Sequence, residues 1–470
     1  TFNKHYMDLA QQAVHDQLLS KLSSKNWYDQ NLKPALAAVD PKTGNLVAFY
    51  GGTDSFNWAV QGQVQPGSTF KAFTLATAFQ QNYSPNSFID GSSPWPAPGN
   101  AAEQAAAAHD PQVKNDDGSK GIITLNTATA ESVNTAFVRL ANQVTYNDVM
   151  KTVNQLGITD HNAQGLRADA RLTLGIASVS PARMAAAYSA FANNGSQYPL
   201  IEVKEIKNSD GTDWKPNAKP NQVLDPNVAE TVTQTLAHVT HDTDGTGYGS
   251  VNGTGLDNIA GKTGTSTMDL ANIQAHYPDI YDKTRNGYYT TSAVWFNGYT
   301  SNLETAVAIS RSVPEKDPKT GATVYIPAPV DNINGNGFSF GASNSLPIWE
   351  EFMKLMQGTK SAYVGDPKFP TPNLSGMKLL NSPSASPSPS ATKPSTTPST
   401  PGPGNGHGNH SFSPSPTATL SSSPTSSPSC QPSLFNPCNG GGGGGGSTPS
   451  TTPSATATAT KKGIGGGIGG

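Results

Sequence analysis

The chain has 470 residues and a formal net charge of −3 at pH 7, so its composition gives no basic surface of the kind that binds nucleic acid. Charged residues make up only 13% of the sequence, below the about 25% that is usual for soluble domains. No run of about 18 apolar residues is present, which excludes a membrane-spanning helix within this sequence, and the first residues lack the pattern of a signal peptide.

The composition divides the chain near Asn381. Residues 381–470 consist mostly of Pro, Ser, Thr and Gly, contain no Asp or Glu, and cannot bury enough apolar surface to offset the entropy of ordering. We therefore predict one folded domain at residues 1–380 and a disordered low-complexity tail at residues 381–470. The only cysteines, Cys430 and Cys438, lie in this tail, which excludes a cysteine nucleophile in the domain and leaves open whether the two pair.

The first predicted elements are a helix, a hairpin and further helices. Residues 2–22 have helical apolar spacing, and the segment 35–52, ALAAVDPKTGNLVAFYGG, predicts two strands joined by an Asp-Pro-x-x-Gly turn. Residues 70–79 form an apolar helix, and residues 125–144 predict two helices with a break near Ser132.

The later elements complete an α/β pattern. Segment 180–195 predicts a helix with Ser180 as its N-cap and Pro181 in its first turn, and residues 225–240 predict another helix. Three consecutive strands, rich in aromatic and β-branched residues, follow in AGKTGT (260–265), TTSAVWFNGYT (290–300) and ETAVAISR (304–311). The sequence therefore predicts an α/β fold in which an antiparallel sheet lies between layers of helices.

A serine and a lysine three residues apart, Ser68 and Lys71, form the first candidate catalytic pair. The pattern Ser-x-x-Lys also occurs at Ser375 and Ser390, but only Ser68 begins a convincing helix, where residues i and i+3 share a face. The backbone N–H of Ser68 would lie among the unpaired donors of the helix N-terminus, which are suited to stabilising an oxyanion. The alternative is a chance occurrence in a serine-rich chain.

The serine hydroxyl needs a base, and a lysine with the ordinary pKa of about 10.4 is protonated at neutral pH. Burial and a second cation both lower a lysine pKa, so the hypothesis requires another lysine close to Lys71. The triplet Lys-Thr-Gly occurs at Lys42, Lys262 and Lys319. The first and third follow Asp-Pro and are typical of surface turns, whereas Lys262 lies in a predicted strand among small residues.

The pattern Ser-x-Asn is common, and it occurs at Ser24, Ser55, Ser84, Ser132 and Ser250. Only Ser132–Asn134 interrupts a predicted helical stretch, where both side chains of a tight turn can point the same way. Ser132 would then relay a proton and Asn134 would hydrogen-bond an amide. The alternative is that Ser132 only caps the following helix.

The order Ser-x-x-Lys, Ser-x-Asn, Lys-Thr-Gly resembles the signature set of penicillin-binding proteins and class A β-lactamases. Over about 350 residues the chain is similar to a penicillin-binding transpeptidase domain of the class A type. The similar segments are 34–52, 57–73, 172–195, 245–266 and 295–300. The resemblance implies the fold of the serine β-lactamase and D,D-peptidase superfamily, in which an all-helical subdomain accompanies the sheet and its helices.

The resemblance also implies roles for the candidate residues. Ser68 would attack the carbonyl of a D-Ala-D-Ala stem peptide, Lys71 would take the proton of Ser68, and Ser132 would pass a proton to the leaving amine. Asn134 would hold the donor peptide, and Lys262 would add positive potential. Thr263 and Thr265 would bind the terminal carboxylate of the peptide, and Gly264 would lie between them in the substrate-binding strand.

The resemblance implies a peptidoglycan D,D-transpeptidase at the outer face of the cytoplasmic membrane, acylated by β-lactam antibiotics. It implies no nucleic-acid partner, no cofactor and no metal. The class A type carries a glycosyltransferase domain and a membrane anchor, and this sequence contains neither. We expect a membrane anchor in the full-length protein, and whether a glycosyltransferase domain precedes this chain is left open. The alternatives are a D,D-carboxypeptidase, a β-lactamase, or a penicillin-binding sensor without turnover.

Two departures from the family pattern bear on these alternatives. Val133 stands where class A β-lactamases prefer Asp, and no glutamate is placed as a recognisable deacylating base, which favours the transpeptidase. Residues 94–110, PWPAPGNAAEQAAAAHD, match no part of the family pattern and are interpreted as a loop.

Overall fold

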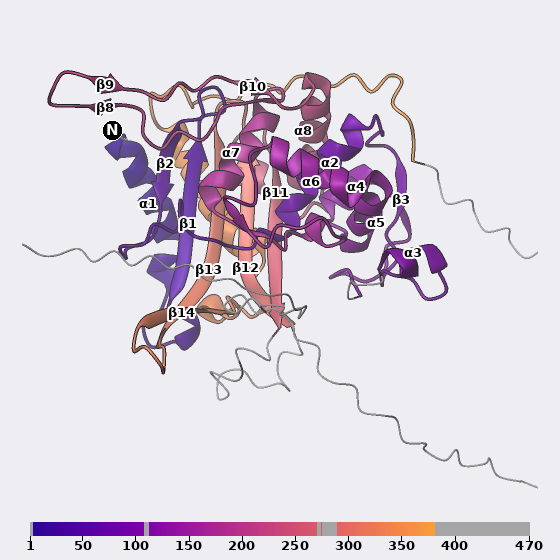
Figure 1. Ribbon diagram of the computed structural model, residues 1–470, viewed down its shortest axis with the longest axis horizontal. Helices are drawn as coiled ribbons and strands as arrows, with labels where there is room; N and C mark the ends of the chain where they lie inside the picture. The colour runs from indigo at the N-terminus through magenta and orange to yellow at the C-terminus, as the bar shows by residue number, and fades with distance from the viewer. Residues whose placement is uncertain (1–2, 108–111, 270–273, 275–288, 381–470) are drawn as a thin grey trace, which may run out of the picture. The chain divides into compact units, whose positions relative to one another are not determined.

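The computed structural model describes residues 3–107, 112–269, 274 and 289–380 (Figure 1). The predicted disordered tail, with both cysteines, lies outside the described residues. Within them, no helix is both long enough and apolar enough to cross a membrane.

A six-stranded antiparallel sheet forms the centre of this body, in the order β11-β12-β13-β1-β2, with β14 pairing onto β13. The strands are β1 (Leu32–Val39), β2 (Leu46–Tyr50), β11 (Ala260–Asp269), β12 (Tyr289–Tyr299), β13 (Glu304–Lys316) and β14 (Thr323–Ala328). The three late strands predicted from the sequence are therefore neighbours, and β11, which carries Lys262, lies at the edge of the sheet.

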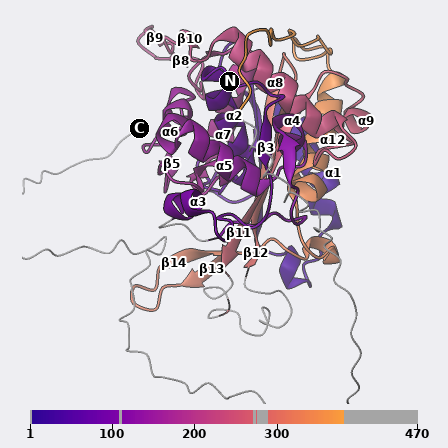
Figure 2. The same ribbon diagram turned by 90° about the vertical axis from the view of Figure 1, so that its right-hand side faces the viewer.

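The sheet separates two hydrophobic cores, because successive side chains of a strand point to opposite faces. Along β1, Ala35 and Ala37 contribute to one core, whereas Leu36 and Ala38 contribute to the other. Both faces are apolar, and both are covered by helices (Figure 2).

One face of the sheet is covered by α1 (Lys4–Gln17) and α12 (Leu346–Gln357), which pack against each other. The other face is covered by α7 (Pro181–Ala192) and α8 (Pro226–His241). As predicted, α7 begins with Ser180 as its cap, whose hydroxyl accepts a hydrogen bond from the N–H of Arg183.

Further helices form a mainly helical region beside α8. They are α2 (Lys71–Gln80), α4 (Leu125–Ala130), α5 (Asn134–Val144) and α6 (Tyr146–Gln155), with the short α3 (Ala101–Ala106). The short α9 (Ser250–Thr254) packs against α12 and the neighbouring α8. Short strands pair locally: β3 (Phe88–Asp90) with β4 (Ile122–Thr124), β5 (Ala163–Gln164) with β6 (Ser178–Val179), β7 (Ser196–Gln197) with β10 (Asn221–Gln222), and β8 (Ile206–Lys207) with β9 (Asp213–Trp214). The predicted α/β fold is confirmed.

One buried hydrogen bond links the layer that covers the sheet to the start of α2. The hydroxyl of Tyr188, on α7, donates to the backbone carbonyl of Thr69, and both residues are fully buried. We expect Tyr188→Phe to lower the free energy of unfolding by about 1–2 kcal/mol, because the buried carbonyl loses its partner. Urea unfolding measures this change.

Tyr248→Phe is the matched control, because Tyr248 is 53% exposed and its hydroxyl has no hydrogen bond within the described residues. An equal effect in both variants would show that the Tyr188 bond contributes nothing specific.

Candidate active site

Ser68 lies in a 3-10 turn, Gly67–Phe70, that runs directly into α2 at Lys71. The sequence predicted Ser68 in the first turn of the helix itself; the i to i+3 bonding of the 3-10 turn moves the α-helical start to Lys71. The turn starts with Gly67 at φ +57°, and a Cβ there would lie 2.5 Å from the carbonyl oxygen of Thr265. Glycine at this position therefore lets the Ser68 turn lie directly against β11.

The strand β11 approaches the same turn from its own side. A Cβ on Gly264 would lie 2.3 Å from the carbonyl oxygen of Pro66, so glycine is again required for the contact. The hydroxyl of Ser266 donates to the carbonyl of Gln65 at 2.8 Å. The Lys-Thr-Gly strand and the Ser-x-x-Lys turn therefore lie beside each other although nearly 200 residues separate them in the sequence. Tertiary packing holds the two segments together and offsets the entropy of closing so long a loop.

The Ser-x-Asn motif occupies the break between α4 and α5, as the sequence predicts. Ser132 has φ +58°, a conformation that a side chain other than glycine rarely adopts. The ammonium of Lys71 donates to the Ser132 carbonyl at 2.6 Å, to the Ser132 hydroxyl at 3.0 Å and to Oδ1 of Asn134 at 2.7 Å. The left-handed turn therefore presents both side chains to Lys71.

The Ser68 hydroxyl is half-buried and makes no hydrogen bond within the described residues. All three polar contacts of the Lys71 Nζ are with Ser132 and Asn134. In this arrangement Lys71 is bound to the second motif and makes no hydrogen bond to Ser68.

Both lysines of the site are buried completely. Burial holds the pKa of Lys71 well below its ordinary value, the positive charge of Lys262 lowers it further, and the negative charge of Asp116 opposes the shift. Burial also lowers the pKa of Lys262, to about 7. Within the part of the chain that the structure describes, neither lysine forms an ion pair that would offset the cost of burying its charge.

The hydroxyls of β11 complete the group of polar side chains. The Lys262 ammonium lies 3.3 Å from the carbonyl oxygen of Thr263, whose hydroxyl is 2.7 Å from that of Thr246. Thr265 is half-buried, and its hydroxyl accepts a hydrogen bond from the N–H of Gly341 at 3.4 Å. A cation with two hydroxyls along one strand is suited to binding a carboxylate.

The structure thus brings together every candidate residue of the sequence analysis. It also adds residues that the sequence did not indicate: Thr246 and Gly341, which contact the β11 threonines, and Lys114, whose carbonyl accepts a hydrogen bond from Nδ2 of Asn134 at 3.1 Å. Two of these contacts use backbone groups, which leave no signal in side-chain patterns.

The buried state of Lys262 has a consequence for stability. A lysine whose pKa is lower in the folded protein than in the unfolded chain takes up a proton on unfolding at any pH between the two values. Between about pH 7 and about pH 9, this lysine therefore makes the free energy of unfolding rise with pH. The added stability is lost again as the pH falls toward the pKa of Lys262 in the folded protein. We expect Lys262→Met to show a smaller rise than wild type in urea unfolding across this range.

Lys319→Met is the control, because Lys319 belongs to an identical Lys-Thr-Gly triplet but is exposed. Parallel pH profiles for wild type and Lys262→Met would contradict a buried lysine with a lowered pKa.

Comparison with known proteins agrees with the fold. Residues 35–330, which include every candidate residue, match the model of the penicillin binding protein transpeptidase domain. Penicillin-binding protein 1A of Neisseria flavescens is 28% identical over 340 residues, covering 70% of this chain and 36% of that protein. Penicillin-binding protein 1A of Aquifex aeolicus is 26% identical over 332 residues, covering 69% of this chain and 38% of that protein.

The structures of penicillin-binding proteins share the fold. PonA1 from Mycobacterium tuberculosis aligns with a TM-score of 0.61 and 22% identity, covering 85% of this chain and 92% of that one. PonA1 in complex with penicillin V aligns with a TM-score of 0.57 and 23% identity, covering 79% of this chain and 87% of that one. The chain spans little more than a third of the length of the curated relatives it matches. On the family match over residues 35–330, the chain belongs to the penicillin-binding protein transpeptidase domain family.

Proposed function

We propose that the chain is a peptidoglycan D,D-transpeptidase that works through an acyl-enzyme on Ser68. One observation carries the proposal: the ammonium of Lys71 contacts Ser132 and Asn134 while a second buried lysine, Lys262, lowers its pKa. A buried lysine with a lowered pKa, three residues from a serine whose hydroxyl makes no hydrogen bond within the described residues, supplies the groups that nucleophilic catalysis requires.

In the first step, the Oγ of Ser68 attacks the carbonyl carbon between the two D-alanines of a stem peptide. The Oγ proton passes to the neutral amine of Lys71, and the negative charge moves to the carbonyl oxygen. The backbone N–H groups of Ser68 and Thr265 would stabilise this oxyanion. As the C–N bond breaks, Ser132 gives its hydroxyl proton to the leaving D-alanine amine and recovers one from Lys71.

In the second step, the amine of a neighbouring stem peptide attacks the ester on Ser68. Its proton returns through Lys71 and Ser132 to the Ser68 oxygen, which leaves as a hydroxyl. The enzyme is restored and a new peptide bond joins the two stems. Water in place of the amine would make the same enzyme a carboxypeptidase.

Substrate recognition falls to β11 and the Asn134 amide. Lys262, Thr263 and Thr265 would bind the terminal carboxylate, and Gly264 keeps the strand flat enough for the peptide to lie along it. Asn134 would bind the donor peptide backbone, for which its amide must exchange part of its present contacts with Lys71 and Lys114. Because β-lactams present an acylating carbonyl beside a carboxylate, they would occupy the same groups and remain on Ser68.

The contacts of the glutamate next to the second motif in the sequence favour slow hydrolysis of the acyl-enzyme. Glu131 precedes Ser132 in the chain, and its carboxylate forms an ion pair with Lys120 at 2.8 Å. A paired carboxylate is a poor general base for a water that would release the acyl group. The pairing of Glu131 therefore favours a transferase over a β-lactamase. A transferase acting on peptidoglycan would work outside the cytoplasmic membrane.

Treatment with penicillin tests the nucleophile. We expect intact-mass spectrometry to show one full-size penicillin adduct on wild type and none on Ser68→Ala, because the ester oxygen is missing. Ser375→Ala is the matched control, since Ser375 begins another Ser-x-x-Lys but is exposed, and it should form the adduct like wild type. An adduct on Ser68→Ala would remove Ser68 from this role.

The fate of the acyl group tests the reaction. With a stem-peptide donor and an amine acceptor, we expect chromatography to show a transfer product that increases with acceptor concentration at the expense of hydrolysis. Hydrolysis that is insensitive to the acceptor would indicate a carboxypeptidase. Rapid release of penicillin would indicate a β-lactamase, and an adduct without either product would indicate a sensor.

A further inference from the structure

The segment between the first and second motifs, residues 91–121, is closed at its base and built against the site. We refer to it as the 91–121 segment, and the structure describes its residues 91–107 and 112–121. Its ends are joined by backbone hydrogen bonds from Gly91 N–H to the Gly121 carbonyl at 2.6 Å and from Lys120 N–H to the Gly91 carbonyl at 3.2 Å. It includes the stretch that resembles no part of the family pattern.

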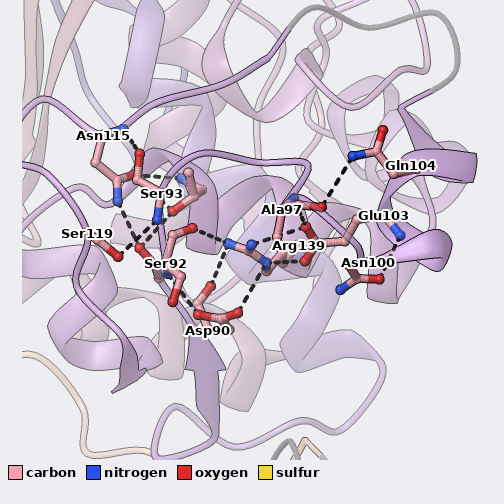
Figure 3. A network of polar contacts seen from close by, with 12 residues as sticks. Asp90, Ser92, Ser93, Ala97, Asn100, Glu103, Gln104, Asn115, Ser119 and Arg139 are labelled. Atoms are coloured by element: carbon pink, nitrogen blue, oxygen red, sulfur yellow. Dashed lines mark hydrogen bonds and ion pairs between the residues drawn. The ribbon is translucent and has the colours of Figure 1, made fainter. Parts of the chain in front are cut away.

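A buried ion pair anchors the segment to α5 (Figure 3). Arg139 contacts both carboxylate oxygens of Glu103, at 2.5 and 3.1 Å, and the two side chains are 10% and 11% exposed. Arg139 also donates to the carbonyls of Asp90 and Ser92, and Trp95 is fully buried nearby. A bidentate pair with this degree of burial fixes the position of both partners.

Asn115 joins the segment to the start of α5, the helix that Asn134 begins. Its Oδ1 accepts hydrogen bonds from the N–H and the hydroxyl of Thr135, at 2.9 and 3.0 Å. Its Nδ2 donates to the carbonyls of Gly91 and Gly118, both at 2.9 Å. All of the usual amide bonds of Asn115 are made, and one of them satisfies a helix N-terminal N–H.

The residue before Asn115 reaches the catalytic group directly. The carbonyl of Lys114 accepts a hydrogen bond from Nδ2 of Asn134, and Oδ1 of Asn134 accepts one from Lys71 at 2.7 Å. An amide donates from one end and accepts at the other, so a carbonyl placed at the nitrogen end turns the oxygen end toward the ammonium. The orientation of Asn134 is therefore set from the 91–121 segment.

Asp116, which follows Asn115, adds a charge. Two charged groups act on Lys71: the positive Lys262 on β11 and the negative Asp116 in the segment, whose carboxylate raises the pKa that Lys262 lowers. Asp116 is exposed, whereas its neighbour Asp117 is paired with Lys120 at 3.9 Å. The segment thus contacts the second motif and contributes the negative charge that acts on the buried lysine.

We propose that the 91–121 segment is a positioning element that orients the Asn134 amide through Lys114 and Asn115. Its value to catalysis rests on the proposed function, whereas its effect on Asn134, and through Asn134 on Lys71, does not. The segment holds Lys71 on the second motif in the free protein, and Asn115 is a positioning residue rather than a catalytic one.

The charge of Lys71 gives a readout that is independent of turnover. In protein labelled with 13C-lysine, we expect the titration midpoint of the Lys71 Cε resonance to fall in Asn115→Ala, because the Asn134 oxygen that accepts a hydrogen bond from Lys71 loses its support. Asn208→Ala, in an exposed turn, is the matched control and should leave the midpoint unchanged.

The acylation rate gives a second readout. Asn115→Ala, measured below its melting temperature and per folded molecule, should react with penicillin about tenfold slower than wild type, because the Asn134 turn loses its support. Asn208→Ala, in an exposed turn, should react like wild type.

The two proposals fail in different ways. If wild type is not acylated but Asn115→Ala still moves the Lys71 midpoint, the proposed function is wrong and the positioning role stands. If the Lys71 midpoint is the same in wild type and Asn115→Ala, the positioning role is wrong, whatever the acylation rate.

Discussion

Two fully buried lysines without a carboxylate partner in the described part of the chain define this site. Placing one unpaired charge in a protein interior costs several kcal/mol, and placing two of the same sign side by side costs more. Folding therefore favours loss of a proton from Lys71 or Lys262, and the free amine is what a serine nucleophile needs. The reactivity proposed for Ser68 is in this sense a consequence of packing.

The packing that brings the lysines together depends on close contacts between backbones. Gly67 and Gly264 let the turn before α2 and the edge strand β11 approach within distances that any Cβ would obstruct. The hydroxyl of Tyr188 donates a hydrogen bond to the turn before α2, and the Lys114 carbonyl of the 91–121 segment accepts one from Asn134 of the second motif. The candidate site is thus assembled from three parts of the chain, each fixed by its own buried contacts.

Much of this arrangement could be predicted from the sequence, because the signals were local. Turn residues and apolar spacing gave the hairpin of β1 and β2, the break at Ser132 and the cap of α7. The Lys-Thr-Gly triplet of Lys262 could be separated from two others because those follow Asp-Pro. The fold class followed from the order of the elements, and the structure confirms it.

The remaining features depend on contacts that sequence patterns do not encode. The Lys114 carbonyl and the Gly341 N–H are backbone groups, so their residue types carry no information about these bonds. The ion pair of Arg139 and Glu103 joins two residues that are 36 positions apart on separate helices. No local sequence pattern indicates that these two residues contact each other. The Ser-x-x-Lys spacing also does not reveal that Lys71 contacts the second motif and makes no hydrogen bond to Ser68. Two side chains three residues apart on a helix share a face, but this spacing does not require them to contact each other.

The pH dependence of penicillin acylation in wild type and Lys262→Met tests the central claim most directly. In wild type, the rate constant should fall as the pH drops through the pKa of Lys71, which burial and the Lys262 charge hold well below the ordinary lysine value. Without the second ammonium, Lys71 should keep its proton to higher pH, so the acidic limb should move upward even if the maximal rate also falls. An acidic limb that stays in place, or moves to lower pH, would contradict the account.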